Sequence, residues 1–445
     1  MNNYIAQTQS AAPLAIFRIA FGLLMLISTI RFAAKGWISK LYIEPQFFFS
    51  YLGFEWVKPL GGNGMYVIFA LLGLCCILIM VGLFYRVAAV SFFLLFTYVE
   101  LLDKTYYLNH YYFISIVAFI IIWLPANRYF SLDACRNPSI AQKQVPRWTI
   151  DILKLQVGLV YFYAGLAKIN TDWLLHAHPL KMWLPAKNNL PIIGELFNYK
   201  ATAYLFSWAG ALYDLSIPFL LLYTKYRKWA FVAVVIFHLL TWALFPIGMF
   251  PFIMIFAAII FFSGNFHQNI IDKISFRTLP AIPQQQSTSL FSTSKMALTG
   301  LAFFMLLQIT LPWRHLLYPG NLFWHEQGYR FSWRVMLMEK AGYASFKVVD
   351  KTTGEWRVVN SYEYLTPAQE KMMATQPDMI WQFSKFLQKE FEKKGYDHVE
   401  VYAEVYATLN GSGSKLLVDP SVNLAAQSYG IGHKSWILPF ENKRL

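Results

Sequence analysis

The sequence predicts an α-helical multi-pass membrane bundle of about nine spans, followed by a small C-terminal α+β domain outside the membrane. Hydrophobic residues make up 57% of the chain and charged residues only 14%, whereas about a quarter of the residues of a soluble domain are charged. Uncharged runs long enough to cross about 30 Å of hydrocarbon recur until the composition changes after residue 312. We therefore expect a transmembrane domain at residues 1–312 and an extracytoplasmic α+β domain at residues 313–445.

Apolar runs with little charge give the expected spans, and the first of them is expected to be retained. It carries Arg18, has no small-residue cleavage site and follows no basic residue, unlike a signal peptide. Several runs are short, so a count of seven or eight spans is also open. The nine runs lie near residues 13–33, 65–84, 87–102, 111–126, 150–168, 203–223, 228–245, 248–263 and 295–312.

The distribution of charge predicts the orientation in the membrane. The net charge of +14 is spread over short loops, so it does not form the basic face of a nucleic-acid-binding protein. Lys and Arg are concentrated in one set of alternate loops, which predicts a cytoplasmic N-terminus and a C-terminal domain outside. Residues 278–294, rich in Pro, Gln, Ser and Thr, are expected to form an irregular cytoplasmic loop. Three cysteines provide neither a disulfide framework nor a zinc site.

The region after residue 312 has the patterns of a small mixed domain. Residues 346–349 and 356–359 flank a Gly-containing turn and predict a β-hairpin. A helix is expected from about residue 367 to residue 394. Residues 398–408 alternate between apolar and polar side chains, which predicts a further strand.

Ionisable groups inside the expected spans are candidates for function, because each costs about 3 kcal/mol on insertion scales. Most are expected to be structural, since an intramembrane Arg or Asp commonly pairs with a group on a neighbouring helix. We favour this structural role for Arg18, Glu100 and Asp214. The full set comprises Arg18, Glu100, Asp151, Lys154, Lys168, Asp214 and His238.

Lys168 stands out because it ends an apolar run beside small residues, with Tyr161 seven residues earlier on the same helical face. A lysine with little water around it can lose its proton and act as a base. The alternative is a lysine that extends to the outer headgroups, and position alone does not separate the two.

Asn109 and His110 lie in a short connection that is expected to face the same outer side as Lys168. A lone histidine in such a loop is more often a surface residue. The chain has no Walker motif, no dinucleotide glycine pattern and no HExxH or zinc spacing. Phosphate, nicotinamide and zinc chemistry are therefore not expected.

Several segments, in order along nearly the whole chain, resemble the vitamin K-dependent γ-glutamyl carboxylases and their bacterial relatives, the horizontally transferred transmembrane domain proteins. The segments are FRIAFGLLM at 17–25, GLFYR at 82–86, LLDKTYYLNHYY at 101–112, ANRYFSLDA at 126–134, VYFYAGLAKINTDW at 160–173, LYDLSIPFLL at 212–221, FHLLTWALFPIGMFPF at 237–252, GYRFSWRVMLMEK at 328–340 and DPSVNL at 419–424.

The resemblance implies roles for particular residues of this chain. Lys168 matches the lysine that deprotonates vitamin K hydroquinone. Asn109 and His110 match a pair that would hold the quinone oxygen and stabilise developing negative charge. Further residues resemble positions near the naphthoquinone pocket or where the outer domain closes over it: Tyr161, His238, Phe245, Met249, Tyr329, Trp333 and Met336.

The resemblance also implies the chemistry. Reduced vitamin K, either phylloquinol or menaquinol, reacts with O₂ and leaves as its epoxide, and the strong base formed on the way removes a γ-proton from a protein or peptide glutamate. Addition of CO₂ then gives γ-carboxyglutamate. The activity is that of a carbon-carbon lyase or carboxylase with epoxidase activity, and neither metal nor biotin is required. The expected location is a bacterial inner membrane.

Two departures from the family pattern bear on glutamate delivery. Animal carboxylases continue well beyond the DPSVNL segment and have a disulfide in the outer domain, whereas this chain lacks that cysteine pair. Met338 replaces a histidine of the motif segment. Two alternatives are epoxidation of a lipid quinol without carboxylation and a non-catalytic quinone-binding or lipid-binding membrane protein.

Overall fold

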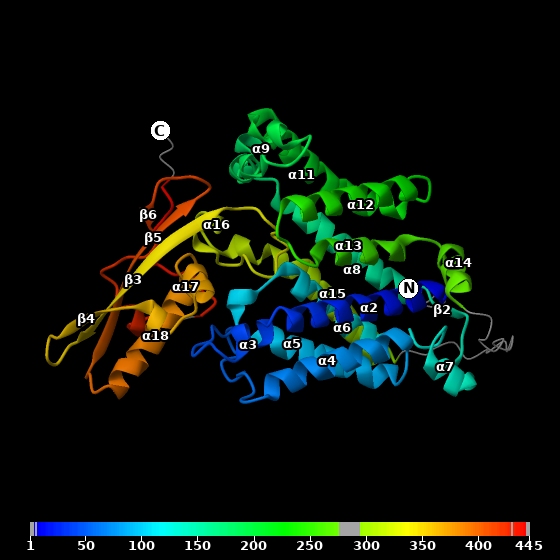
Figure 1. Ribbon diagram of the computed structural model, residues 1–445, viewed down its shortest axis with the longest axis horizontal. Coiled ribbons are helices and arrows are strands. Elements are labelled where there is room, and N and C mark those ends of the chain that lie inside the picture. Colours follow the sequence, from blue (N-terminus) through cyan, green and yellow to red (C-terminus); the bar gives the residue numbers. More distant parts are fainter. Residues whose placement is uncertain (1–3, 5–6, 276–293, 429, 442–445) are drawn as a thin grey trace.

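The computed structural model describes residue 4 and residues 7–275, 294–428 and 430–441. A bundle of long helices forms one part of the molecule, and a sheet with two helices against it forms the other (Figure 1). Of the irregular loop expected at 278–294, all but the last residue lies outside the described residues.

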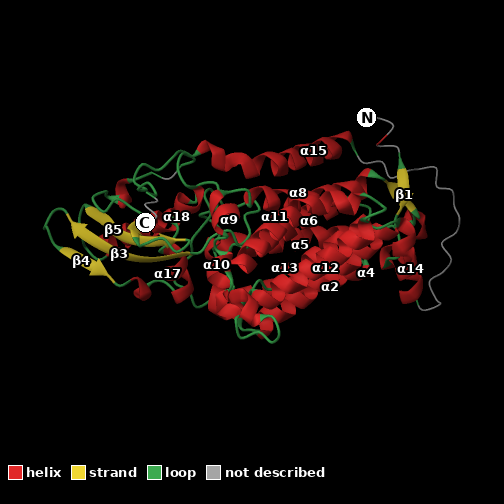
Figure 2. Cartoon of the chain, turned by 90° about the horizontal axis from the view of Figure 1, so that it is seen from above, coloured by secondary structure: helices red, strands yellow, loops and turns green. Residues whose placement is uncertain are grey.

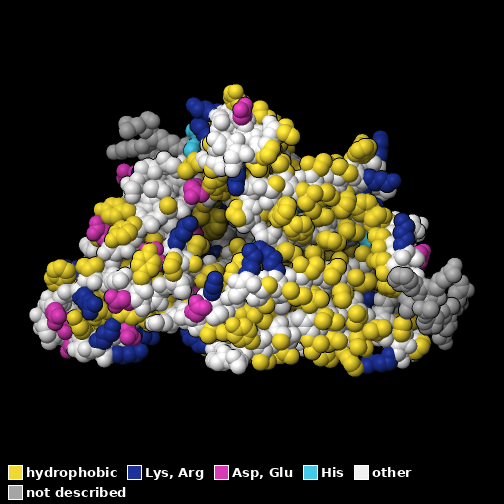
Figure 3. All heavy atoms as spheres, viewed as in Figure 1, with side chains coloured by type: hydrophobic (Ala, Val, Ile, Leu, Met, Phe, Trp, Pro, Cys, Tyr) yellow, Lys and Arg dark blue, Asp and Glu magenta, His cyan; other side chains and the backbone are white. Residues whose placement is uncertain are grey.

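Apolar helices make up the bundle, as the sequence predicted. Among the described residues, seven helices are long and apolar enough to cross a membrane, or eight if one bent pair counts as a single span. Hydrophobic side chains cover the visible face of this part, while charged side chains gather over the sheet part (Figure 3). The seven are α2 (Ala12–Ala34), α4 (Gly64–Val81), α5 (Tyr85–Leu102), α8 (Trp148–Ala167), α11 (Lys200–Leu222), α12 (Arg227–Leu244) and α15 (Lys295–Thr310) with its continuation to Leu317.

The two remaining expected spans are shorter than the others. α6 (Asn109–Trp123) has 15 residues. α13 (Phe250–Ala258) continues as a 3-10 turn to Phe261, and the chain then bends by 115° into α14 (Gly264–Ile274). All nine apolar runs are therefore helical, but only seven of them are full-length spans: α6 is short, and the run at 248–263 ends in a bend that hydropathy does not reveal.

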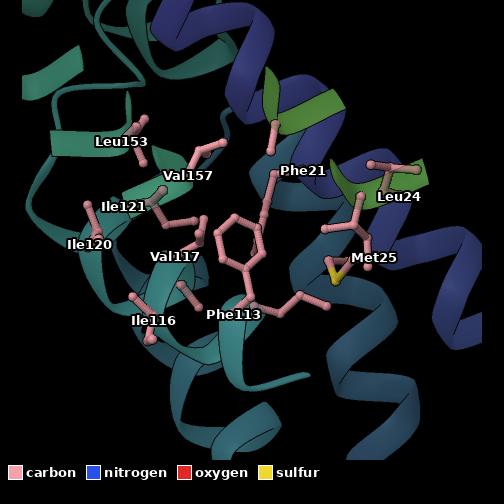
Figure 4. Packing of buried hydrophobic residues seen from close by; sticks show 14 of the residues in the cluster. Phe21, Leu24, Met25, Phe113, Ile116, Val117, Ile120, Ile121, Leu153 and Val157 are labelled. Atoms are coloured by element: carbon pink, nitrogen blue, oxygen red, sulfur yellow. The ribbon is translucent and has the colours of Figure 1, made fainter. Parts of the chain in front are cut away.

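Apolar side chains from several helices meet inside the bundle. Phe21 and Met25 of α2 lie near Phe113 and Val117 of α6, with Val157 of α8 beside them (Figure 4). In a bilayer, van der Waals contacts between side chains packed in this way hold the helices together.

Short elements complete the bundle. β1 (Thr8–Ser10) pairs antiparallel with β2 (Gln144–Pro146), which ties the start of the chain to the loop before α8. The other short helices are α3 (Trp37–Tyr42), α7 (Leu132–Arg136), α9 (Thr171–His176), α10 (Leu180–Trp183) and α16 (Leu322–His325).

The outer part is a four-stranded antiparallel sheet with strand order β4-β3-β5-β6 and two helices packed against it (Figure 2). The expected hairpin is confirmed, because Phe346 pairs with Val359 and Val349 with Trp356. The strands are β3 (Lys340–Asp350), β4 (Trp356–Val359), β5 (Val399–Leu409) and β6 (Lys415–Leu416).

One expectation for this part is wrong. The single helix expected from 367 to 394 is two helices, α17 (Pro367–Met373) and α18 (Pro377–Lys393). Pro377 has no backbone N–H to donate to the preceding turn, so it begins a new helix instead of continuing α17.

Candidate functional site

Lys168 and Asp214 form a buried ion pair inside the bundle. Lys168 follows the last turn of α8, Asp214 lies within α11, and Lys168 Nζ is 2.5 Å from Asp214 Oδ2. The two residues are only 6% and 4% exposed. The expected pairing of Asp214 with a neighbouring helix is therefore present, and Lys168 is directed to this partner instead of to the outer headgroups.

A glycine brings the two helices close enough for this pair. A Cβ on Gly165 would lie 2.8 Å from the backbone nitrogen of Leu215, which is closer than any methyl group can approach. Gly165 precedes Lys168 by less than one turn, and Leu215 is the residue after Asp214. The small residue thus sets the helix separation that the ion pair needs.

The ion pair lies on the wall of a cavity of about 100 Å³, which we call the membrane cavity. Its volume is below the roughly 300 to 1,000 Å³ of typical ligand sites, so a two-ring ligand enters only if side chains move. Besides the ion pair, its walls include Tyr161, Trp173, Trp183, His238, Thr241, Phe245, Phe250, Met254, Val335 and Met336.

A second polar pair lines the same cavity. The Tyr161 hydroxyl lies 2.9 Å from His238 Nε2, while His238 Nδ1 is buried without a hydrogen-bond partner among the described residues. A buried ring nitrogen without a partner is costly. A polar group of a ligand that reached this nitrogen would remove that cost.

Five of the ten residues predicted from the sequence lie together on this cavity. They are Tyr161, Lys168, His238, Phe245 and Met336.

Asn109 and His110 lie beside the membrane cavity but do not line it. The His110 ring centroid is 5.9 Å from that of Phe250, and the Phe250 centroid is 5.8 Å from that of His238. Asn109 Nδ2 donates a hydrogen bond of 3.0 Å to the backbone carbonyl of Arg334. In this structure Asn109 therefore holds the segment that closes the cavity.

Met249, Tyr329 and Trp333 do not line the cavity either. Trp333 is buried against Tyr112, with ring centroids 5.0 Å apart, and Tyr329 packs 6.2 Å from Phe323. Met249 packs at the edge of the bundle core.

The backbone that closes the cavity adopts an unusual conformation. Phe331, Trp333 and Met336 have φ angles of 63°, 58° and 54°, a left-handed region that costs non-glycine residues roughly 1 to 2 kcal/mol each. Such a conformation persists only where surrounding contacts fix it. The hydrogen bond from Asn109 and the packing of Trp333 supply those contacts.

Sequence reasoning missed two features of the site. It placed Asp214 among the structural ionisable groups and did not pair it with Lys168, because the two lie on different helices. It also missed Phe250, whose aromatic ring lies within 6 Å of the rings of both His110 and His238. No group of three or more His, Cys, Asp or Glu side chains that could hold a metal occurs in the part of the chain that the structure describes.

A charged cluster joins the outer part to the bundle. Asp378 of α18 lies 2.7 Å from Lys104 of the loop between α5 and α6 and 2.7 Å from Arg330. Burial alone would raise the pKa of the Asp378 carboxyl, but the charges of Arg330 and Lys104 outweigh it and hold the pKa well below its usual range. We call these three residues the charge clamp.

Two family models match the chain. The HTTM domain matches residues 6–266, which is more than half of the chain, and the vitamin K-dependent gamma-carboxylase lumenal domain matches residues 293–443. No solved structure is significantly similar to the chain.

Proposed function

The chain belongs to the vitamin K-dependent γ-glutamyl carboxylase family, and from this membership we propose that it oxygenates a reduced, vitamin K-type lipid quinol to its epoxide. Coupled to this step, in full or in part, is the carboxylation of a glutamate side chain on a protein or peptide. The observation that carries the proposal is the buried pair of Lys168 and Asp214 on the membrane cavity.

We assign the role of initiating base to this pair and not to Lys168 alone. In the ion pair the ammonium of Lys168 already holds its proton, so the free lone pairs belong to Asp214. A shift of one proton across 2.5 Å frees the amine instead. Either way the pair can accept one proton from a bound hydroxyl, with no further group to reorganise.

The walls of the membrane cavity suit the ring of such a quinol. They are aromatic and aliphatic, with polar groups at the Lys168–Asp214 pair and at Tyr161 and His238. When bound, reduced vitamin K would supply the oxygenation by O₂ from which the base for glutamate arises. Met336 has a flexible side chain that can shift to admit the ring, and His238 Nδ1 is available to one ring oxygen.

The carboxylation half also needs a group that holds the glutamate. Met338, at the position of a family histidine, packs in the apolar core of the outer part and offers no polar group to a substrate. Robust epoxide formation with weak carboxylation of short free peptides is therefore the expected outcome, since no docking sequence raises the local peptide concentration.

The experiment is mass spectrometry of the purified protein incubated with reduced vitamin K, O₂ and bicarbonate, with and without a glutamate peptide. Epoxide in both arms supports the oxygenase. Epoxide and γ-carboxyglutamate in near-equal amounts on a free peptide would show full coupling. Neither product, with several quinols tried on folded protein, would favour a non-catalytic quinone-binding protein.

A further inference from the structure

Glu100 carries a carboxyl group inside the bundle that has no partner among the described residues. It lies in the last turn of α5 and makes no ion pair or hydrogen bond with any of them, so the pairing that the sequence predicts for it is not present there. The Thr97 hydroxyl, one turn earlier on the same helical face, is buried and also lacks a hydrogen-bond partner among the described residues. Polar groups left unsatisfied inside a membrane bundle carry a free-energy cost that a ligand would remove.

Both residues line a second cavity of the bundle, between α5, α6 and α15, which we call the lateral cavity. Its volume is about 320 Å³, within the roughly 300 to 1,000 Å³ of typical ligand sites. The Tyr112 hydroxyl donates a hydrogen bond of 2.8 Å to Gln308 Oε1, which joins α6 to α15. α15 runs along one edge of the bundle and is largely exposed (Figure 2). The lateral cavity therefore lies near the lipid-facing surface of the bundle.

The walls of the lateral cavity favour a planar ring over an acyl chain. Seven of its thirteen lining residues are aromatic, and aromatic side chains pack well on a second ring in offset or edge-to-face contacts. The Phe119 ring centroid is 5.5 Å from that of Phe93 and 4.5 Å from that of Phe304. A cluster of rings therefore lines one part of the cavity, and Glu100 and Thr97 supply unpaired polar groups.

A ring hydroxyl fits these polar groups in either protonation state of Glu100. It can donate a hydrogen bond to the carboxylate or accept one from the carboxylic acid, and the Thr97 hydroxyl can likewise donate or accept. An aromatic ring that carries a hydroxyl group is the chemistry of a quinol.

The lateral cavity and the membrane cavity border the same segment of the chain. Phe331 lines the lateral cavity, whereas Val335 and Met336 line the membrane cavity. The Phe331 ring centroid lies 5.1 Å from that of Tyr107 and 4.9 Å from that of Tyr112, and both tyrosines also line the lateral cavity. A ligand in the lateral cavity would therefore lie against the segment that closes the membrane cavity.

We propose that the lateral cavity is a second site for a lipid quinol, in which the Glu100 carboxyl and the Thr97 hydroxyl bind a ring hydroxyl. The inference rests on the proposed function, because it gives the same class of ligand a second place in the bundle. The membrane cavity, at about 100 Å³, admits a two-ring ligand only after side chains move, whereas the lateral cavity already has the volume of a ligand site.

The test is photo-crosslinking of the whole protein in detergent with phylloquinol that carries a diazirine on its side chain and is kept reduced under argon. Mass spectrometry locates the labelled peptides, and excess unlabelled phylloquinol shows which labelling is specific. Glu100→Leu removes the carboxyl, Glu100→Gln keeps a hydrogen-bonding group, and Ser115→Phe fills the lateral cavity. Ser216→Phe is the control, because Ser216 is exposed on α11 and lines neither cavity.

Specific labelling should occur on α5, α6 or α15 as well as around the membrane cavity, and Ser115→Phe should remove only the first set. Glu100→Leu should raise the apparent Kd of the lateral cavity by roughly 10- to 100-fold, as loss of a hydrogen bond to a charged group predicts. Glu100→Gln should raise it less, and Ser216→Phe should match the wild type.

Lack of specific labelling at the lateral cavity of the wild type would overturn the inference, as would equal labelling there in Ser115→Phe. A diazirine-bearing phosphatidylglycerol gives the remaining arm: if it labels the lateral cavity and excess phylloquinol does not compete, the site belongs to a glycerolipid and the inference is wrong. Failure of the proposed function would show separately, as a wild-type protein that binds phylloquinol at both cavities but forms no epoxide when O₂ is admitted.

Discussion

At the scale of single residues, the membrane cavity combines costly polar groups with apolar walls. Two buried charges lose their hydration, and only a close contact between them offsets that free-energy cost. The 2.5 Å contact of Lys168 with Asp214 provides such geometry. The Tyr161 hydroxyl is a hydrogen-bond partner for Nε2 of His238, and Nδ1 of His238 has no partner among the described residues.

Tyr161→Phe should weaken quinol binding. The change leaves both ring nitrogens of His238 without a partner, which costs about 1 to 3 kcal/mol of stability. Without Tyr161 the His238 ring is no longer held in place for the quinol oxygen, and a loss of about 1 kcal/mol from that contact raises the quinol KM about fivefold. Tyr163→Phe is the control, because its hydroxyl bonds Ile309 and Trp313 outside the membrane cavity. Equal quinol KM values for the two variants would contradict the assignment.

At the scale of elements, α8 and α11 hold the two halves of the ion pair. Their close approach depends on Gly165, because any side chain there meets the backbone of α11. Helix α15 contributes less to this part of the bundle and is largely exposed. The distance between Lys168 and Asp214 therefore depends on how closely α8 and α11 pack.

Gly165→Ala should push α8 away from α11 and lengthen the ion pair. Overpacking of this kind costs about 1 to 3 kcal/mol, so both unfolding temperature in detergent and epoxide turnover should fall. Gly158→Ala, on the same helix, adds a Cβ that meets only Pro218 at an ordinary 3.7 Å. That control should be neutral or slightly stabilising; similar losses in both variants would mean that Gly165 has no special packing role.

The sequence predicts which segments form helices and strands better than it predicts which residues contact one another. Apolar runs and alternation identify α2, α8 and the strand pair β3–β4, since these signals are local. The break at Pro377 and the bend after Phe261 depend on single residues and on packing. Asp214 and Phe250 reach the site through helix contacts that no local pattern encodes.

At the scale of the whole molecule, the charge clamp fixes the outer part on the bundle. Lys104 belongs to the membrane part, and Asp378 and Arg330 belong to the outer part. A hydrogen bond of 2.8 Å from Gln369 to Asp103 supports the same contact. The outer part is therefore joined to the loop after α5 by the Lys104–Asp378 ion pair and a hydrogen bond.

Asp378→Asn should leave two buried cations without a counterion and cost about 3 to 5 kcal/mol. Because the folded-state pKa of Asp378 is depressed, its contribution is complete above the unfolded pKa of about 3.9 and is lost as pH falls below it. The free energy of unfolding should therefore contain the full contribution of this group, without a pH dependence from it, between about pH 5 and pH 8. Asp397→Asn, at an exposed aspartate, is the control and should change stability by less than about 0.5 kcal/mol.

Single-cysteine labelling tests the proposed orientation, with a cytoplasmic N-terminus and the outer part outside. The background is Cys135→Ser, because Cys135 is exposed. Asn189→Cys and Lys351→Cys should react with an impermeant reagent in intact cells, and Thr224→Cys should not. Labelling of Thr224→Cys alone would reverse the orientation.

The most direct test of the central claim compares Lys168→Met with the double variant Lys168→Met/Asp214→Asn. The single change leaves Asp214 as an unpaired buried carboxyl, so it should lower stability by about 3 to 5 kcal/mol and epoxide turnover by about 10² to 10⁴. The double change restores a neutral, similarly shaped pair, so we expect stability to recover while turnover stays lost. A double variant that keeps more than about a tenth of wild-type turnover would show that the pair is structural and that the base lies elsewhere.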